Sequence, residues 1–344
     1  MAQVDGIEHE AVTAWLQQRV ALTPPVTYTV IEGGRSNLTY TVTDAAGNRL
    51  VLRRPPLHGV LESAHDMGRE HRIISALAPT PVPVPATIGY EPDVAVNGAP
   101  FYVMEHVEGA VLRDAAAAEQ LLAADLRGAA SQAVLDTLVA LHDVDPDAVG
   151  LGELARKSDY LARQLKRWHG QLQHSRTREL PVLDEVHARL SADLPEQGPA
   201  TIVHGDYRLD NLILDPHSGQ VAAVLDWELT TLGDPLADLG LLLVYWAEPG
   251  DETIPLLDSP TLLPGFATRA ELVERYAAAS GRDLTHLDVY VAFGYWKLAC
   301  ILEGVYSRYA SGAYGDTGDS FRVFGDIVLQ LGERAAEAVG RAGR

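Results

Sequence analysis

Cysteine is nearly absent from this chain, since Cys300 is the single cysteine among 344 residues. This excludes disulfide frameworks and zinc sites built from several thiolates. Lysine is also scarce, with three residues in all, and Lys and Arg together number 27 against 47 Asp and Glu. The resulting net charge of −20 is opposite in sign to what nucleic-acid phosphates or an anionic membrane surface attract. We therefore expect neither nucleic acid nor a membrane as a partner.

Long hydrophobic runs are missing as well. The longest one, Leu239–Ala247, is far shorter than the roughly 20 residues that a membrane-spanning helix needs. The first ten residues are acidic and lack the basic start and the apolar stretch of a signal peptide. Together these absences predict a cytoplasmic protein. Apolar residues still make up 47% of the chain, which predicts a substantial core in one large domain or in two lobes.

The N-terminal third is predicted to be rich in β-strands. A helical pattern over Ile7–Val20 ends at prolines, and short β-rich runs separated by glycine-containing turns follow it. A second helix is expected over Ser63–Ala78, because the proline-rich stretch after it cannot continue a helix. Successive short strands joined by tight turns favour an antiparallel sheet. The expected strands are Tyr28–Ile31, Leu38–Thr43, Leu50–Arg53, Thr87–Tyr90 and Phe101–His106.

Beyond Gly109 the pattern becomes mainly helical, with one short β-rich island. The expected helices are Ala115–Leu141, Asp159–His174, Val182–Leu194, Pro235–Trp246, Arg269–Ser280, Leu284–Tyr309 and Phe321–Ala338. The island comprises Ile202–His204, Leu212–Leu214 and Val221–Leu225. This order predicts an α+β fold of two lobes. A small antiparallel-sheet lobe would cover residues 1–106, and a larger, mainly helical lobe would cover residues 107–344.

Oxygen-bearing side chains follow the strands of this island. Asp206 and Asn211 lie in the loop between two apolar strands, and Asp226 follows the next strand along the chain. Carboxylate and amide oxygens suit a hard cation such as Mg²⁺, which takes one or two protein carboxylates and completes its shell with phosphates and water. The pattern therefore predicts a magnesium site that also serves a phosphate-bearing ligand.

The stretch from His204 to Asn211, His-Gly-Asp-Tyr-Arg-Leu-Asp-Asn, resembles the catalytic loop of protein-kinase-like phosphotransferases. The glycine after His204, and the Asp226-Trp227 pair in place of Asp-Phe-Gly, resemble the aminoglycoside phosphotransferase and choline kinase family. The segments 33–40 and 233–240 are similar to the branch whose kinase domains accompany acyl-CoA dehydrogenases. The resemblance implies a protein-kinase-like two-lobe fold and an ATP- and Mg²⁺-dependent kinase, with GTP as an open alternative.

The resemblance also implies roles in the larger lobe. Asp206 would accept or orient the proton of the attacking hydroxyl, and Asn211 and Asp226 would hold Mg²⁺ against the nucleotide phosphates. Arg208 would neutralise charge on the transferred phosphoryl group, or else it pairs with a nearby carboxylate, Asp210 or Asp234. Three further residues would support the site: His204 ties the loop backbone together, Glu228 lies behind the metal, and Asp238 braces the loop through backbone N–H groups.

The smaller lobe would hold the nucleotide. Arg53 stands where the family has a lysine, and Glu70 is its expected ion-pair partner. The other residues assigned to the nucleotide are Gly34, Ser36 and Asn37 near the phosphates, and the backbone of Glu105 and Val107 beside the adenine edge. Because Arg replaces the expected Lys, a catalytically silent nucleotide-binding module of the pseudokinase type remains the alternative.

The acceptor is expected to be the hydroxyl group of a small molecule. The likeness to dehydrogenase-associated kinases favours a hydroxyacyl compound, and the acidic charge of the chain favours a cationic, aminoglycoside-like substrate. The sequence does not decide between them, and it predicts no oligomeric state.

Overall fold

The computed structural model describes residues 4–31, 37–57, 66–252, 254, 259–311 and 321–342. The chain divides into two compact units. The first contains Met1–Gly109 together with the short segment Ala222–Leu229, and the second contains Ala110–Val221 and Thr230–Arg344. The sequence analysis expected one division point, between residues 106 and 107. That division leaves Ala222–Leu229 in the larger lobe, whereas the structure assigns this segment to the first unit.

The first unit is built on a five-stranded sheet with the order β1-β2-β3-β5-β4, in which every neighbouring pair is antiparallel. This confirms the antiparallel sheet expected from the sequence. Its strands are β1 Thr27–Val30, β2 Leu38–Thr43, β3 Arg49–Arg54, β4 Thr87–Glu91 and β5 Phe101–Glu105. Its helices are α1 His9–Gln17, α2 Met67–Leu77 and α3 Val94–Asn97. Helix α3 is a short element that the sequence pattern did not predict.

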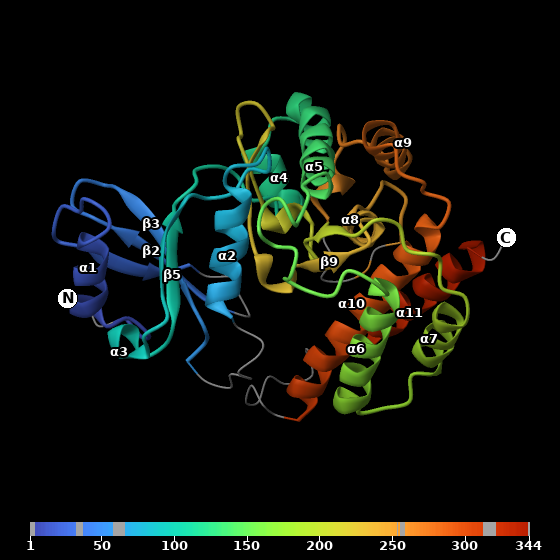
Figure 1. Ribbon diagram of the computed structural model, residues 1–344. Coiled ribbons are helices and arrows are strands. Elements are labelled where there is room, and N and C mark those ends of the chain that lie inside the picture. The colour runs from blue at the N-terminus through green and yellow to red at the C-terminus, as the bar shows by residue number, and fades with distance from the viewer. Residues whose placement is uncertain are drawn as a thin grey trace. The chain divides into compact units, whose positions relative to one another are not determined.

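The two faces of this sheet differ because side chains alternate along a strand. On one face, Leu52 and Val103 join a hydrophobic cluster with Trp15 of α1. Arg53 is the neighbour of Leu52 along β3, and Tyr102 is the neighbour of Val103 along β5, so both lie on the other face. They are paired across the two strands, on the face against which α2 packs. Figure 1 shows α1 and α2 on opposite sides of the sheet. A buried polar cluster can therefore form beneath α2.

The second unit is mainly helical, as the sequence predicts. Its helices are α4 Ala115–Leu121, α5 Arg127–His142, α6 Tyr160–Ser175, α7 Pro181–Ala192, α8 Leu236–Tyr245, α9 Arg269–Ser280, α10 Leu287–Ala310 and α11 Arg322–Ala342. Its short strands include β6 Thr201–Val203, which pairs antiparallel with β9 Thr231–Gly233, and β7 Leu212–Leu214. Strand β8, Val221–Val224, has its first residue in the second unit and its other residues in the first.

One expected helix is wrong as a single element. The stretch Ala115–Leu141 forms α4 and α5, separated by an extended residue, Leu122, and a 3₁₀ turn, Ala124–Leu126. Leu122 is buried. Burial of this side chain overrides the high helix propensity of the surrounding alanines.

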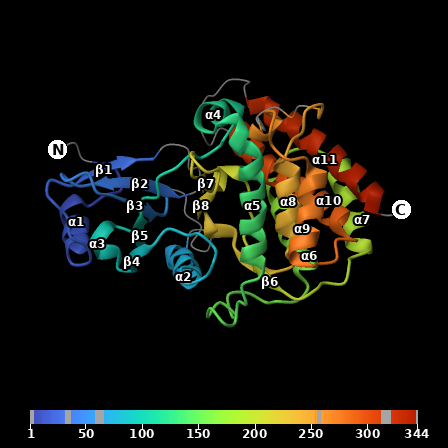
Figure 2. The ribbon, with the colours of Figure 1, turned by 90° about the horizontal axis from the view of Figure 1, so that it is seen from above.

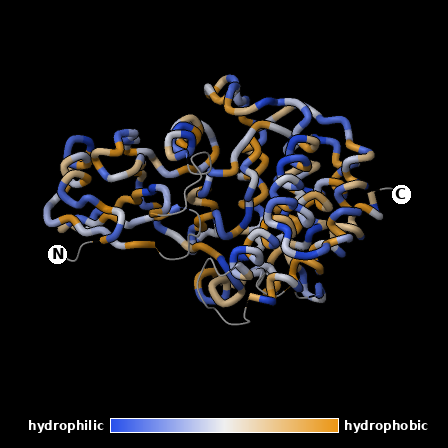
Figure 3. The backbone as a smooth tube through the Cα atoms, turned by 90° about the horizontal axis from the view of Figure 1, so that it is seen from below, coloured by the Kyte–Doolittle hydropathy of each residue, from blue (hydrophilic) through white to orange (hydrophobic). Residues whose placement is uncertain are grey.

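Helix α10 is the centre of the second unit and packs against α6, α7, α8 and α11 (Figure 2). Gly240 of α8 permits the close approach, because a Cβ atom there would lie 2.7 Å from the carbonyl carbon of Tyr290. Apolar and polar segments alternate along the backbone of this unit, as expected for helices that bury one face (Figure 3). Among the described residues, no helix has the length and apolarity to cross a membrane.

Candidate active site

The loop after β6 is held from below by one buried carboxylate. The Asp238 side chain on α8 accepts hydrogen bonds from the backbone N–H of His204 at 2.6 Å and of Gly205 at 2.8 Å. Residue 238 is completely buried. The structure thus contains the brace that the family resemblance implies, and it places the loop at the start of α8.

The surroundings of the Asp238 carboxylate favour its ionised form despite its burial. Burial acts to raise its pKa, but hydrogen bonding and charge from His142, and the N–H group of Gly205, outweigh burial and lower the pKa below its ordinary value. The His142 ring lies between Asp238, at 3.3 Å from Nε2, and the Tyr276 hydroxyl, at 2.8 Å from Nδ1. The negative charge is therefore a fixed feature of the loop.

Asp206 follows this braced segment and is oriented by Asn211. The Asn211 Nδ2 group donates to the Asp206 carbonyl oxygen at 2.8 Å and to its carboxylate Oδ2 at 3.0 Å. The backbone N–H of Asp206 donates to His204 Nδ1 at 3.2 Å, so His204 does tie the loop together. Because the donor end of the Asn211 amide is used inside the loop, its oxygen is the end suited to a cation.

Arg208 lies beside the same carboxylate. Its guanidinium is 2.9 Å from Asp210 and 3.5 Å from Asp206, and it stacks over the Tyr245 ring at 4.7 Å. The ion pair with Asp210 that the sequence left open is therefore present. Asp234, the other candidate, instead accepts a hydrogen bond from the Tyr290 hydroxyl at 2.7 Å. A phosphate-binding role for Arg208 remains a prediction.

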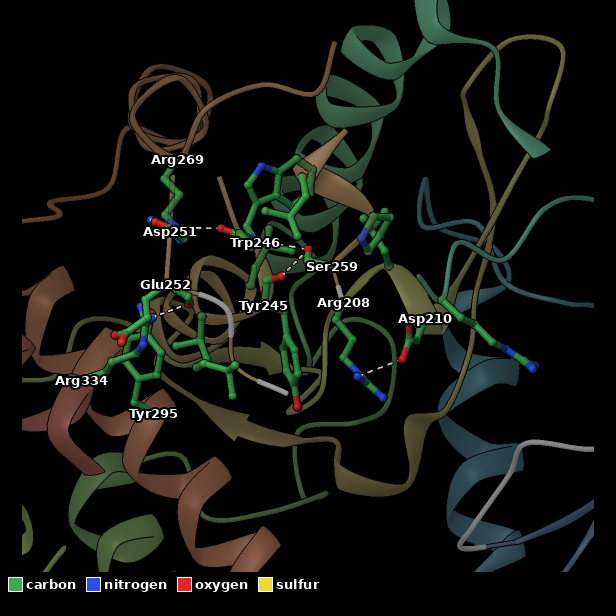
Figure 4. Close-up of a pocket in the computed structure, with 18 residues that line it drawn as sticks. Arg208, Asp210, Tyr245, Trp246, Asp251, Glu252, Ser259, Arg269, Tyr295 and Arg334 are labelled. Carbon is green, nitrogen blue, oxygen red and sulfur yellow. Dashed lines mark hydrogen bonds and ion pairs between the residues drawn. The ribbon is translucent and has the colours of Figure 1, made fainter. Parts of the chain in front are cut away.

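A pocket in the second unit includes Arg208 and Asp210 in its wall (Figure 4). Aromatic and aliphatic side chains, Tyr245 and Leu242 among them, line much of it. Its described lining holds four arginines and three carboxylates: Arg113, Arg208, Arg269, Arg334, Asp210, Asp251 and Glu252. In a chain with a net charge of −20, this described lining carries one excess positive charge.

Most of these charges are paired along the wall. Arg269 forms ion pairs with Asp251 and Glu248, and Arg334 is 3.8 Å from Glu252. Burial acts to raise the pKa of Asp210, and the charges of Arg208 and, to a lesser extent, of exposed Arg113 act to lower it. Burial wins overall, so the pKa of Asp210 lies above its ordinary value.

The first unit contains a second cluster, beneath α2. Arg53 of β3 lies 3.2 Å from Glu70 of α2 and 3.2 Å from Asp226. The ion pair with Glu70 predicted from the sequence is present, and the side chain of Glu70 is 1% exposed. The Tyr102 hydroxyl donates to Glu70 at 2.9 Å, and Asn37 Nδ2 donates to the same carboxylate at 3.0 Å.

Asn37 also donates to Glu228 at 3.2 Å, which ties β2 to the segment that carries Asp226. Asp226 has a positive φ of 64°, a backbone conformation that non-glycine residues rarely adopt. Strained residues of this kind cluster at ligand-binding sites. Trp227, fully buried after it, donates from Nε1 to the Val224 carbonyl at 3.1 Å and anchors the turn.

Each unit contains one of the two predicted magnesium ligands, Asp226 in the first and Asn211 in the second. Among the described residues, no group of three or more His, Cys, Asp or Glu side chains could hold a metal by itself. The side chain of Asp226 is 31% exposed, and Asn211 presents an amide oxygen. A carboxylate and an amide oxygen are each of the kind that Mg²⁺ takes beside a nucleotide. That the two residues share one ion remains a prediction.

Four further residues, Gly34, Ser36, Glu105 and Val107, are predicted to bind the nucleotide. Gly34 and Ser36 lie outside the described residues. Glu105 ends β5, and its N–H group donates to the Ala86 carbonyl at 2.9 Å, while Val107 follows two residues later. Their contact with adenine remains a prediction.

Sequence reasoning did not single out Tyr102, His142 or Lys297. Tyr102 and His142 carried no signal, since each looks like an ordinary core residue in its own element. Lys297 did carry one, because it is one of three lysines in the chain and stands in an apolar helical run.

The chain is similar in sequence to known phosphotransferases and to part of a larger protein. The model of the phosphotransferase enzyme family matches residues 27–290. Mouse acyl-CoA dehydrogenase family member 10 is 36% identical over 295 residues, covering 84% of this chain but only 27% of that protein. The chain thus spans about a quarter of the length of that relative.

Solved structures share the fold. A protein from Ralstonia eutropha assigned to the aminoglycoside phosphotransferases has a TM-score of 0.80 and 31% identity, with 97% of this chain and 99% of that chain covered. A thermostable mutant of an aminoglycoside phosphotransferase, in complex with AMP-PNP and hygromycin B, has a TM-score of 0.59 and 18% identity, covering 97% of this chain and 98% of that one. The second likeness concerns the fold alone.

Proposed function

Because the chain belongs to the phosphotransferase enzyme family, we propose that it is an ATP- and Mg²⁺-dependent kinase that phosphorylates a hydroxyl group of a small metabolite. The observation that carries the proposal is the loop geometry. Asn211 holds the Asp206 carboxylate at 3.0 Å in a segment that buried Asp238 braces. A carboxylate held in this way is oriented before the substrate arrives, which is the main contribution a protein makes to phosphoryl transfer.

The proposed reaction is an in-line displacement. The acceptor oxygen forms a bond to the γ-phosphorus, the bond between that phosphorus and the bridging oxygen breaks, and ADP leaves. Asp206 accepts the hydroxyl proton, and Arg208 faces the charge on the transferred group. Asn211 and Asp226 are the proposed Mg²⁺ ligands, and the bound ion would neutralise the phosphate oxygens.

ATP is the proposed donor, and GTP is the alternative. The proposed nucleotide-binding residues are Gly34, Ser36, Asn37, Arg53, Glu70, Glu105 and Val107. The complex of a structural relative with AMP-PNP supports an adenine nucleotide. Within the first unit, the contact of Arg53 with both Glu70 and Asp226 supports a place for its guanidinium beside the phosphates.

The pocket chemistry favours a hydroxyacyl acceptor over an aminoglycoside. An aminoglycoside carries several positive charges and is best held by a surplus of carboxylates. The described lining instead has four arginines against three carboxylates, with aromatic and aliphatic walls. This combination suits an apolar chain with an anionic end.

The test is phosphate transfer from γ-labelled ATP with Mg²⁺ to a panel of hydroxyacyl-CoA thioesters, free hydroxy acids and aminoglycosides. We expect label in a hydroxyacyl product, and a loss of about 1,000-fold or more in kcat for Asp206→Asn with nucleotide binding retained. Asp193→Asn, an exposed position after α7, is the matched control and should behave as the wild type. Transfer to aminoglycosides alone would overturn the acceptor class.

A silent nucleotide-binding module is the second candidate, favoured by one observation. Arg53 is engaged with both Glu70 and Asp226 in the structure, so it could stabilise the unit without catalysis. That candidate predicts nucleotide binding with no label transferred to any acceptor, and the same slow ATP loss in the wild type and in Asp206→Asn.

A further inference from the structure

Lys297 is buried in the middle of α10, where an ammonium group is costly. The residue is 6% exposed, and its neighbours on the helix include Phe293 and Cys300, both buried. Its Nζ atom donates to the carbonyl oxygen of Gly205 at 2.6 Å and lies 5.4 Å from the centre of the Trp168 ring. A lysine is rarely buried unless its charge has a specific partner.

The partner is the peptide that carries Asp206. The carbonyl of Gly205 accepts from Lys297, and the N–H of the same peptide, which belongs to Asp206, donates to His204 Nδ1 at 3.2 Å. Gly205 has a φ of 85°, and its own N–H is bound by Asp238. Both ends of Gly205 are therefore fixed, and the direction in which the chain enters Asp206 follows from them.

We propose that Lys297 is a positioning residue for phosphoryl transfer, which locks the Gly205–Asp206 peptide and supplies a positive charge behind the Asp206 carboxylate. The inference rests on the proposed function. It adds a residue from α10, nearly 90 positions after the loop in the sequence, that touches neither substrate nor nucleotide in the proposed roles.

Lysine suits this place better than arginine. A single carbonyl oxygen is a point acceptor, and an ammonium is a point donor, whereas the guanidinium fork matches two acceptors. Arginine otherwise carries nearly all of the positive charge of this chain, which has three lysines in total. The geometry of this contact therefore explains why a lysine, and not an arginine, stands at this buried position.

Burial and the charges that face Lys297 together set its response to pH. Burial lowers the pKa of Lys297, Asp206 and Asp238 oppose this lowering, and Arg167 adds to it. The net pKa lies below the ordinary value of 10.5, so the ammonium loses its proton at a lower pH than an exposed lysine does. The lock and the charge both weaken when that proton leaves.

The first experiment compares Lys297→Met and Lys297→Gln with Lys166→Met, an exposed lysine of α6, in the phosphate-transfer assay. We expect kcat to fall by about 10- to 100-fold in Lys297→Met, with little change in KM for ATP. Gln, which keeps an N–H donor without the charge, should be intermediate, and Lys166→Met should match the wild type. The wild type should lose kcat in the alkaline range, and Lys297→Met should lack that decline.

Equal kcat values in the wild type and Lys297→Met, or the same alkaline decline in both, would overturn the inference while leaving the proposed function in place. Absence of transfer by the wild type would refute the proposed function instead. In that case amide hydrogen exchange at a single pH still decides about Lys297. We expect faster exchange confined to residues 204–211 in both Lys297 variants, and unchanged exchange there would overturn the positioning role.

Discussion

The Tyr102 hydroxyl donates a hydrogen bond of 2.9 Å to Glu70, and it thereby joins the central sheet of the first unit to α2. Tyr102 is paired with Arg53 across two strands, so the same face of the sheet supplies both the cation and the hydroxyl that hold one buried carboxylate. Three donors, from Tyr102, Asn37 and Arg53, converge on Glu70. The position of Arg53 is thus determined by the network rather than by one ion pair.

Tyr102→Phe should loosen this network without creating a cavity. The change removes one hydrogen bond to a charged group, and we expect a loss of about 1.5–3 kcal/mol in the free energy of unfolding. KM for ATP should rise several-fold because Glu70 and Arg53 become less well oriented, and kcat should change less. Urea unfolding and steady-state kinetics measure the two effects. Tyr90→Phe, on β4 of the same sheet, is the control, and a similar loss in that variant would argue against a specific role for the hydroxyl.

Both the charge and the shape of the Arg53 side chain should contribute to the stability of the first unit. In Arg53→Met, the carboxylate of Glu70 loses its buried cation, and we expect destabilisation of about 3–5 kcal/mol. Arg53→Lys should recover part of this stability, since it restores the charge but contacts Glu70 and Asp226 less well at the same time. Arg49→Met, at an exposed position of the same strand, is the matched control. Thermal unfolding and ATP titration follow the series, and an Arg53→Met protein as stable as the control would contradict the prediction.

The sequence predicted most strands and most helices because their hydrophobic periodicity is local. The main misses have causes that lie elsewhere in the chain. Strand β9 is three residues long and exists through its pairing with β6, about 30 residues earlier. Leu122 interrupts an alanine-rich helix because the side chain is buried by tertiary packing. Neither partner is visible in the local pattern.

The candidate site likewise contains residues that a local pattern predicts and residues that it does not. The spacing within the loop predicted Asp206 and Asn211, and their hydrogen bond is present in the structure. Lys297 contacts a residue about 90 positions away, and Tyr102 contacts one about 30 positions away. No local motif predicts contacts of this kind. Motifs identify the groups of a site that lie close together in sequence, and the buried residues that hold them require the fold.

Asp238→Asn should weaken the loop near neutral pH and reduce the loss of stability that the protein shows in acid. The substitution replaces a buried carboxylate that accepts from two backbone N–H groups, and we expect a loss of about 3 kcal/mol near neutral pH. Because the folded-state pKa lies below the ordinary value of 3.8, the stabilisation by the carboxylate is present above that value and disappears as the pH falls through the folded pKa. Urea unfolding across the acidic range should therefore show a smaller pH dependence in Asp238→Asn than in the wild type. Asp193→Asn is the exposed control, and equal pH dependence in all three proteins would refute the assignment.

Two glycines in helices should respond to alanine in opposite directions. At Gly240 a Cβ atom would meet the Tyr290 backbone at 2.7 Å, so Gly240→Ala must push α8 and α10 apart and should cost about 1–3 kcal/mol. At Gly170 of α6 no atom outside the neighbouring backbone of the helix itself lies within 4 Å of the added carbon, so Gly170→Ala should stabilise by about 0.5–1 kcal/mol through helix propensity. Differential scanning calorimetry of both variants measures the two signs. Since Asp238 and Lys297 lie on α8 and α10, Gly240→Ala should also reduce phosphate transfer, and a fully active, fully stable Gly240→Ala protein would show that the close contact of these helices does not hold the loop.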